Sequence, residues 1–202
     1  MPLNQEVARS IFAAWRIARF DAGAMNYFNL TLEGFWRSFF AAGLVLPFYL
    51  VLTGLQFSRF TGITEAEATP SQLALGDVSL MAFVAVDLVN FACAWVAWPL
   101  LMVPIAGFFG LSRNYVPYII ATNWASVLQR GLLIAVNVLM LSGVFPQGLV
   151  AVLVVIAYVS VLYYDYLIAR AGLDCEIATA IGLVALKAVV TIGINIAFNA
   201  VY

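Results

Sequence analysis

The sequence predicts an all-α protein, a bundle of five transmembrane helices preceded by an N-terminal amphipathic helix at the membrane interface. Of its 202 residues, 65% are hydrophobic and 9% are charged. A soluble domain has about 45–50% apolar and about 25% charged residues. The apolar residues also fall into five runs of about 20 residues, which is the length that crosses a bilayer. We therefore expect lipid to cover much of the surface.

The first 34 residues are expected to form a cytoplasmic segment. Within residues 4–20, apolar side chains recur at helical spacing on one face, and polar ones lie opposite. The apolar face holds Val7, Ile11, Ala14, Trp15 and Ala18, and the polar face holds Gln5, Arg9 and Arg16. Arginine opposite tryptophan is typical of a helix in the membrane interface. Packing on the cytoplasmic ends of the spans is an equally open and compatible alternative.

Residues 35–202 are expected to form one five-helix transmembrane domain. Asp21–Gly23 ends the N-terminal helix, and Asn29 or Thr31 caps the next one. Pro99 and Pro104 are expected to bend or end the second span. The predicted spans are 35–56, 78–98, one within 115–145, 148–169 and 176–202, with turns at 146–148 and 171–174 and one sizeable loop at 57–77.

Arginine distribution predicts the orientation. With the N-terminus cytoplasmic, the outer side holds Arg59 alone, and the inner side holds Arg9, Arg16, Arg19, Arg37, Arg113 and Arg170. This asymmetry follows the positive-inside rule and puts the C-terminus outside. No cleavable signal is visible, so the first span is expected to direct its own insertion. The preference for Arg over Lys, with abundant Ala, Val and Leu, suggests a bacterial inner-membrane protein with a periplasmic C-terminus.

The composition argues against several function classes. A net charge of -1 offers no basic surface for nucleic acid. The chain has no His, and neither Cys93 nor Cys175 has a spaced Cys or His partner, so we expect no metal, redox pair or disulfide. No nucleophile elbow, zinc-protease motif or phosphate-binding glycine loop is present. We therefore expect neither enzymatic activity nor a cofactor.

Ionisable and amide side chains interrupt three of the apolar runs. Charges in the hydrocarbon are costly and face the bundle interior, a partner or water. On each of these three spans the polar residues lie on one helix face, because they are spaced by about three, four or seven residues. Together they predict an intramembrane polar seam made of Asp87, Asn90, Arg130, Asn137, Lys187, Thr191 and Asn195, with Asn123 continuing the third-span stripe.

Within this seam we expect an ion pair between Asp87 and Lys187, which have similar predicted depths. Arg130 has two possible registers: it is central if its span covers 117–143, but it can extend outward if Tyr115, Tyr118 and Trp124 mark the interface. The aromatic residues favour the second register. Asp165 is expected in an aromatic belt, paired with Arg170 or Arg113.

Three stretches resemble bacterial members of the Yip1-like membrane proteins. They are AAWRIARF at 13–20, EGFWRSFFAAGLVLPFYLVL at 33–52 and RNYVPYIIATNWASVL at 113–128. The resemblance extends over the layout of about residues 10–200, with five spans and a cytoplasmic N-terminus. Eukaryotic members act in vesicle trafficking with small GTPases through a longer N-terminal region, so that role is not transferred. For bacterial members the resemblance implies no defined activity.

Two hypotheses on function remain. The first is a non-enzymatic accessory, partner-binding or membrane-organising component, in which the seam fixes helix packing through interhelical hydrogen bonds. The partners would be the lipid bilayer and other membrane subunits. The second is a small transporter or channel that uses Asp87, Arg130 and Lys187 as a polar path. Transporters often have internal repeats, and none is visible here.

Overall fold

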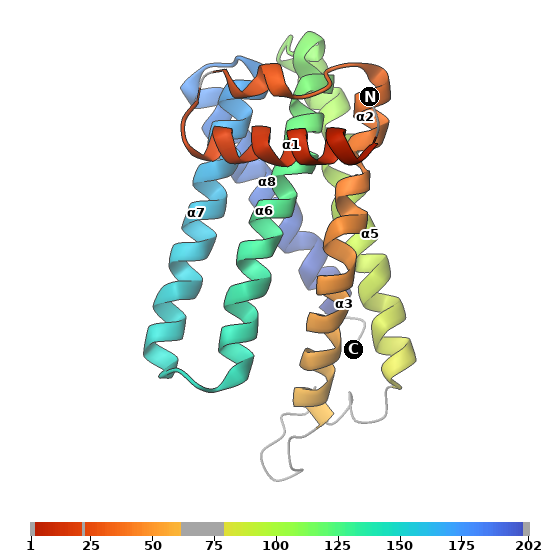
Figure 1. Cartoon of the computed structure of the whole chain (residues 1–202), viewed down its shortest axis with the longest axis vertical. Coiled ribbons are helices and arrows are strands. Elements are labelled where there is room, and N and C mark those ends of the chain that lie inside the picture. Colours follow the sequence, from red (N-terminus) through yellow and green to blue (C-terminus); the bar gives the residue numbers. More distant parts are fainter. Residues whose placement is uncertain (1–2, 22, 62–78, 200–202) are drawn as a thin grey trace.

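The structure, a computed structural model, describes residues 3–21, 23–61 and 79–199, and these are almost entirely helical (Figure 1). Short 3₁₀ turns lie at Ala24–Tyr27 (η1) and Ser112–Asn114 (η2). The α-helices in these ranges are α1 (Leu3–Ala18), α2 (Leu32–Ser38), α3 (Phe40–Thr61), α5 (Leu80–Phe108), α6 (Tyr115–Ser142), α7 (Gln147–Leu173) and α8 (Ile177–Asn199). No strand occurs within them, which confirms the all-α class. Most of the predicted 57–77 loop lies outside the described residues.

Within the described residues, five helical segments are long and apolar enough to cross a membrane, as many as the sequence predicts. The segments are Leu32–Ser58, Leu80–Phe108, Ser112–Ser142, Gln147–Leu173 and Ile177–Phe198. The first combines α2 with most of α3, and the third includes η2. The architecture is therefore that of a multi-pass membrane protein.

The five spans form a ring of neighbours. Contacts join α3 to α6, α6 to α7, α7 to α8, α8 to α5, and α5 back to α3. In the view of Figure 1, α7, α6 and α3 lie in front, while α5 and the oblique α8 lie behind them. This order brings helices that are distant in the sequence together, notably α3 with α6 and α5 with α8.

Most helix boundaries follow from local chemistry. Thr31 caps α2, because its hydroxyl accepts a hydrogen bond from the Gly34 N–H at 3.1 Å, and Ser79 caps α5 in the same way through Ala82 at 3.2 Å. Gly143 closes α6 in the left-handed region (φ 66°), where glycine has no steric penalty. Pro146 then precedes α7 directly. The turn predicted at 146–148 lies instead at residues 143–146, because Gln147 and Gly148 already belong to α7.

The expectation that Pro99 or Pro104 ends the second span is wrong. Helix α5 continues through Pro99 and Pro104 to Phe108. Prolines are tolerated in membrane helices when neighbouring groups satisfy the backbone. Here the Tyr115 hydroxyl donates to the Pro99 carbonyl at 3.1 Å. The Trp98 indole also donates to the Tyr118 hydroxyl at 3.0 Å, so α6 contacts α5 at its first proline and at the residue before it.

Helix α1 lies across one end of the bundle, and we call this the α1 end (Figure 1). It packs on α6 and α7, so the alternative of packing on the spans is confirmed. Its fully buried face consists of Glu6, Ser10, Ala13, Ala14 and Ile17. Of the predicted apolar face, Ala14 is fully buried, and Val7, Ile11 and Ala18 are partly buried against the core. Trp15 is instead 53% exposed. Small side chains let α1 approach the spans closely, and a tryptophan at that contact would hold it away.

The hydrophobic core is concentrated at the α1 end. Its fully buried large side chains come from the adjoining segments of α5, α6 and α7, and include Met102, Ile119, Ile120, Trp124, Ile168 and Leu173. Gly172 permits a close approach of α7 to α6, since a Cβ there would meet the Tyr118 Cα at 3.0 Å. The Tyr164 hydroxyl donates to the Ala14 carbonyl at 2.5 Å and joins α7 to α1. The spans are therefore packed most tightly beneath α1.

Candidate functional site

The first intramembrane polar cluster joins α6, α7 and α8. The Lys187 ammonium lies 2.6 Å from Asp165 Oδ1, and the Gln129 amide donates to the same oxygen at 2.8 Å. The Lys187 and Asp165 side chains are 18% and 11% exposed. We call this the Lys187 cluster. Because each of its three residues comes from a different helix, the cluster fixes the relative positions of three spans.

The second cluster lies between α3, α5 and α6, and we call it the Arg130 cluster. On its α3–α5 side, Asp87 accepts two hydrogen bonds from hydroxyl groups of α3. Tyr49 donates to Oδ1 at 3.0 Å and Thr53 donates to Oδ2. Neutral hydroxyls therefore hold this carboxylate in place of a cation.

Arg130 itself is held by aromatic faces of α5. Its Cζ lies 5.4 Å from the ring centroid of Phe91 and 5.0 Å from that of Trp95. Such cation–π contacts stabilise a desolvated guanidinium by about 2 kcal/mol. Asn90 Oδ1 and Trp95 Nε1, also on α5, are buried without a hydrogen-bond partner among the described residues. This cluster thus contains polar groups whose hydrogen-bonding capacity is unused.

Two sequence predictions about charge pairing are wrong. Lys187 pairs with Asp165 and not with Asp87. Asp165 likewise does not pair with Arg170 or Arg113, and the Arg170 guanidinium donates to the Cys175 carbonyl. Helix α8 contacts both α5 and α7, so adjacency did not decide the pair. Asp165 was expected in an aromatic belt near the end of its span, whereas its carboxylate reaches Lys187.

The favoured register of Arg130 also rested on a wrong assumption. Tyr118 and Trp124 are 3% and 1% exposed, so they are core residues and not markers of an interface. Helix α6 begins at Tyr115, and Arg130 lies near its middle. The guanidinium packs against α5, which is the arrangement expected of the central register.

The remaining seam residues do not form one continuous path. Asn137 donates to the Leu133 carbonyl at 2.8 Å and Thr191 donates to the Lys187 carbonyl at 2.8 Å, both within their own helices. Asn195 is exposed on α8. Asn123 donates to the Ser38 hydroxyl at 2.8 Å, next to α1. The structure divides the predicted seam into the Lys187 cluster, the Arg130 cluster and isolated polar positions.

Sequence reasoning missed Gln129, Tyr49 and Thr53. Gln129 precedes Arg130 and therefore lies on a different face of α6. For this reason one helix contributes to both clusters. Tyr49 and Thr53 are four residues apart on the first span, and that spacing was the available signal. Their hydroxyls matter because they hold Asp87, which was expected to need a cation.

The α1 end holds the ion pairs outside the bundle centre. Glu6 is 2% exposed and lies 2.6 Å from the Arg37 guanidinium, which also contacts Glu33 at 2.5 Å. Arg16 donates to Asp21 at 2.5 Å. The Gly23 backbone N–H and then Arg16 lower the pKa of Asp21, and Asp21 in turn raises the pKa of Arg16. The Arg16–Asp21 pair lies within the N-terminal segment, and the Glu6–Arg37 pair joins that segment to α2.

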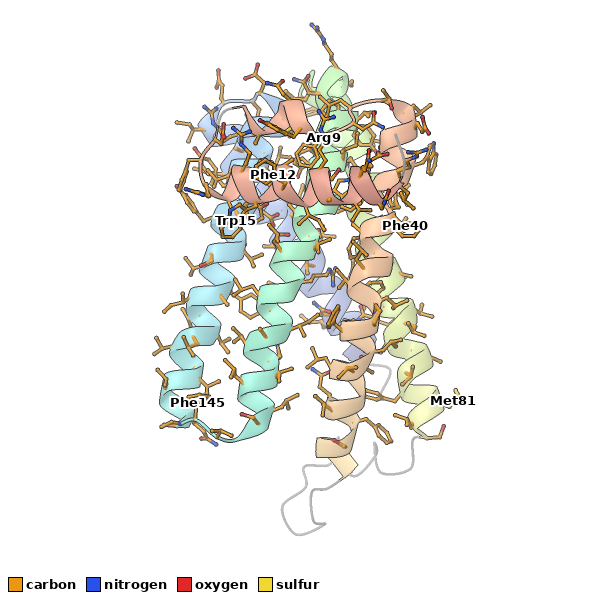
Figure 2. The ribbon with its side chains drawn as sticks, in the orientation of Figure 1. Arg9, Phe12, Trp15, Phe40, Met81 and Phe145 are labelled. Atoms are coloured by element: carbon orange, nitrogen blue, oxygen red, sulfur yellow. The ribbon has the colours of Figure 1, made fainter. Side chains whose placement is uncertain are left out.

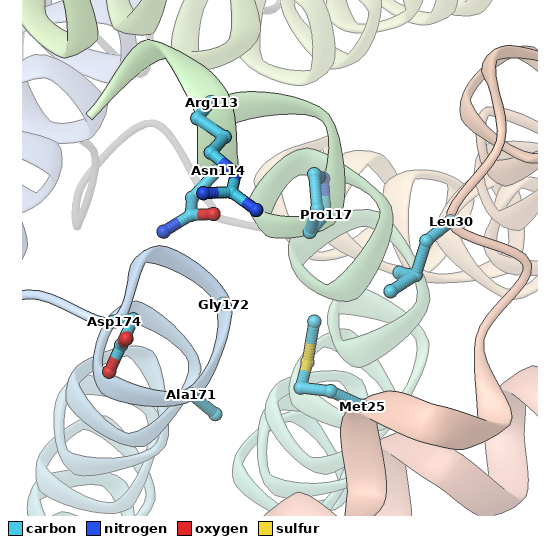
Figure 3. Close-up of a pocket in the computed structure, with 8 residues that line it drawn as sticks. All are labelled: Met25, Leu30, Arg113, Asn114, Pro117, Ala171, Gly172 and Asp174. Atoms are coloured by element: carbon cyan, nitrogen blue, oxygen red, sulfur yellow. The ribbon is translucent and has the colours of Figure 1, made fainter.

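An open depression of about 370 Å³ also lies at the α1 end (Figure 3). It is lined by Met25, Leu30, Arg113, Asn114, Pro117, Ala171, Gly172 and Asp174. The Asn114 amide donates across it to the Leu173 carbonyl at 2.8 Å. Burial raises the pKa of the neighbouring Cys175 thiol. Within the described ranges, no group of three or more His, Cys, Asp or Glu side chains is arranged to hold a metal ion.

Comparisons of this chain with protein-family models, with curated proteins and with solved structures found no match.

Proposed function

We propose that this chain is a non-enzymatic, multi-pass protein of the bacterial inner membrane that acts as an accessory, partner-binding or membrane-organising component. One observation carries the proposal: α8 exposes polar side chains on a membrane-spanning surface. Asn195 is exposed and makes no hydrogen bond within the described residues, and Thr191 lies one turn before it. Polar side chains on membrane helices favour contact with another helix over contact with lipid.

The Lys187 cluster supports the same proposal. Its charges are neutralised between three spans, so they serve the packing of the bundle. This leaves the outer face of α8 available for a partner of the same chemistry, a transmembrane helix with small or polar side chains.

The proposed orientation places the α1 end in the cytoplasm and α1 at the membrane interface. Figure 2 places Arg9 on the side of α1 that faces away from the spans and Trp15 on the side that faces along them. Phe12, Trp15 and Phe20 are 51%, 53% and 66% exposed. Aromatic side chains toward the acyl chains and arginine toward water are typical of an interfacial helix. These features support an N-terminus in the cytoplasm and a C-terminus in the periplasm.

The experiment is purification of the full chain in mild detergent, followed by identification of proteins that co-migrate. We expect a second copy or another membrane protein to co-migrate, and Asn195→Leu to reduce its amount several-fold. Ile196→Leu is the matched control, because Ile196 is 63% exposed one residue away and carries no polar group. A strictly lone monomer in wild type, or equal loss in both variants, contradicts the proposal.

The Arg130 cluster favours a second candidate, a small transporter or channel. Its unused polar groups, Asn90 and Trp95, and its charges Asp87 and Arg130 lie between membrane helices. A flux assay in proteoliposomes under a pH gradient separates the two candidates. If transport uses the predicted seam, wild type should show flux, and this flux should fall in Arg130→Gln or in Lys187→Met. Absence of flux in wild type contradicts this candidate.

A further inference from the structure

The Arg130 cluster has more hydrogen-bond donors than acceptors. A guanidinium carries five N–H donors and no acceptor. Within the described residues, Arg130 makes contacts to the faces of Phe91 and Trp95 and no hydrogen bond or ion pair. Trp95 is 6% exposed, and its indole Nε1–H also lacks an acceptor. A cation and a neutral donor are therefore both left unmatched beside the same ring.

The neighbouring acceptors do not correct this excess. Asn90 Oδ1 is one unpaired acceptor on α5. Asp87 lies one turn from Phe91, and each of its oxygens already accepts a hydrogen bond from Tyr49 or Thr53. A buried polar group without a partner costs free energy, and a buried charge costs more. A ligand that accepts hydrogen bonds and carries negative charge would match this excess of donors and positive charge.

We propose that a small monovalent anion of the size of chloride binds between α5 and α6, contacting the Arg130 guanidinium and the Trp95 Nε1–H. Arg130 supplies the opposite charge, and the indole supplies a directed donor. The rings of Phe91 and Trp95 cover the guanidinium and keep it desolvated, which strengthens its attraction for an anion. The single positive charge of Arg130 matches a ligand with one negative charge.

The probe is chloride itself, added to the purified full chain in detergent in place of gluconate at constant ionic strength. Two readouts are measured: the width of the chloride NMR line and the midpoint of thermal unfolding. We expect chloride to be broadened and the midpoint to rise, since a ligand of the folded state stabilises it. Bromide should compete and gluconate should not, because gluconate is too large.

Three variants test the residues. Arg130→Gln should abolish both chloride effects. Trp95→Phe keeps an aromatic face for Arg130 but lacks the N–H, so it should weaken chloride binding roughly tenfold or more, the effect of one hydrogen bond to a charged group. Arg113→Gln is the control, since Arg113 is an exposed arginine outside the cluster and its loss should leave both effects unchanged.

Trp95→Phe keeps the test informative even if Arg130→Gln does not fold. Absence of any chloride effect in wild type overturns the proposal, as does equal binding by wild type and Trp95→Phe. The competing arrangement is a direct ion pair between Arg130 and Asp87 in solution. Under that arrangement, chloride has no effect on wild type but does affect Asp87→Asn. This result would also overturn the proposed anion site. The anion site is independent of partner binding, because a lone monomer would still contain it.

Discussion

The Lys187 cluster and the Arg130 cluster hold ionisable side chains between membrane helices in different ways. In the first, opposite charges meet directly, with Lys187 2.6 Å from Asp165. In the second, the charges stay apart: hydroxyls of α3 hold Asp87, and aromatic rings of α5 hold Arg130. The difference shows that a membrane bundle can bury ionisable groups without pairing them. In the second arrangement, Asn90 Oδ1 and Trp95 Nε1 stay buried without any hydrogen-bond partner among the described residues.

The largest effect is expected from breaking the Lys187 cluster. Lys187→Met leaves Asp165 buried without a cation, and such a change typically costs about 3–5 kcal/mol of stability. The double variant Lys187→Met with Asp165→Leu should recover most of the loss, because no charge remains. Unfolding by a denaturing detergent measures both. If the double variant is no more stable than the single one, the direct pair is not what stabilises the bundle.

A smaller effect is expected from the aromatic support of Arg130. Phe91→Leu removes one ring face from the guanidinium and should cost about 2 kcal/mol, the upper range of a desolvated cation–π contact. The measurement is a double-mutant cycle with Arg130→Gln, which isolates the coupling between the two side chains. Additive losses would show that Arg130 does not depend on this ring.

The hydroxyl support of Asp87 should contribute less. Thr53→Val preserves shape and burial but removes the donor to Oδ2, and we expect a loss of about 1–2 kcal/mol. Thr122→Val is the matched control, since its buried hydroxyl has no partner in the described part of the chain and its loss should be neutral or stabilising. The same unfolding measurement applies, and equal effects of the two variants would remove Thr53 from the Asp87 site.

The smallest effect is expected from acid, outside the spans. The pKa of Asp21 is lowered below its ordinary 3.8 in the folded chain. Its stabilising contribution is therefore complete above about pH 4 and is lost as the pH falls through the lowered value. In wild type, the rate of hydrogen exchange at residues 3–27, corrected for the intrinsic effect of pH, should increase as the pH falls through this lowered value. Asp21→Asn should show no such step.

Much of the fold was predictable from the sequence, because its signals are local. Run length and composition predicted five spans, and Thr31 and Pro146 marked helix starts that the structure confirms. The prolines of α5 misled the prediction, since their effect depends on whether another helix, here through Tyr115, supports the backbone. On α1, Ala14 is buried as predicted, but Trp15 was misplaced because close packing selected the small side chain of Ala13 over it.

The candidate site was only partly predictable. The sequence alone determined which ionisable residues enter the apolar spans, because an Asp, Arg or Lys within such a run is visible in the linear pattern. It also gave their approximate depth, from a rise of about 1.5 Å per residue. Only the tertiary structure decided the partners: Asp165 for Lys187, hydroxyls for Asp87 and rings for Arg130. Depth is a property of one helix, whereas a partner depends on which helices are neighbours and how each is rotated.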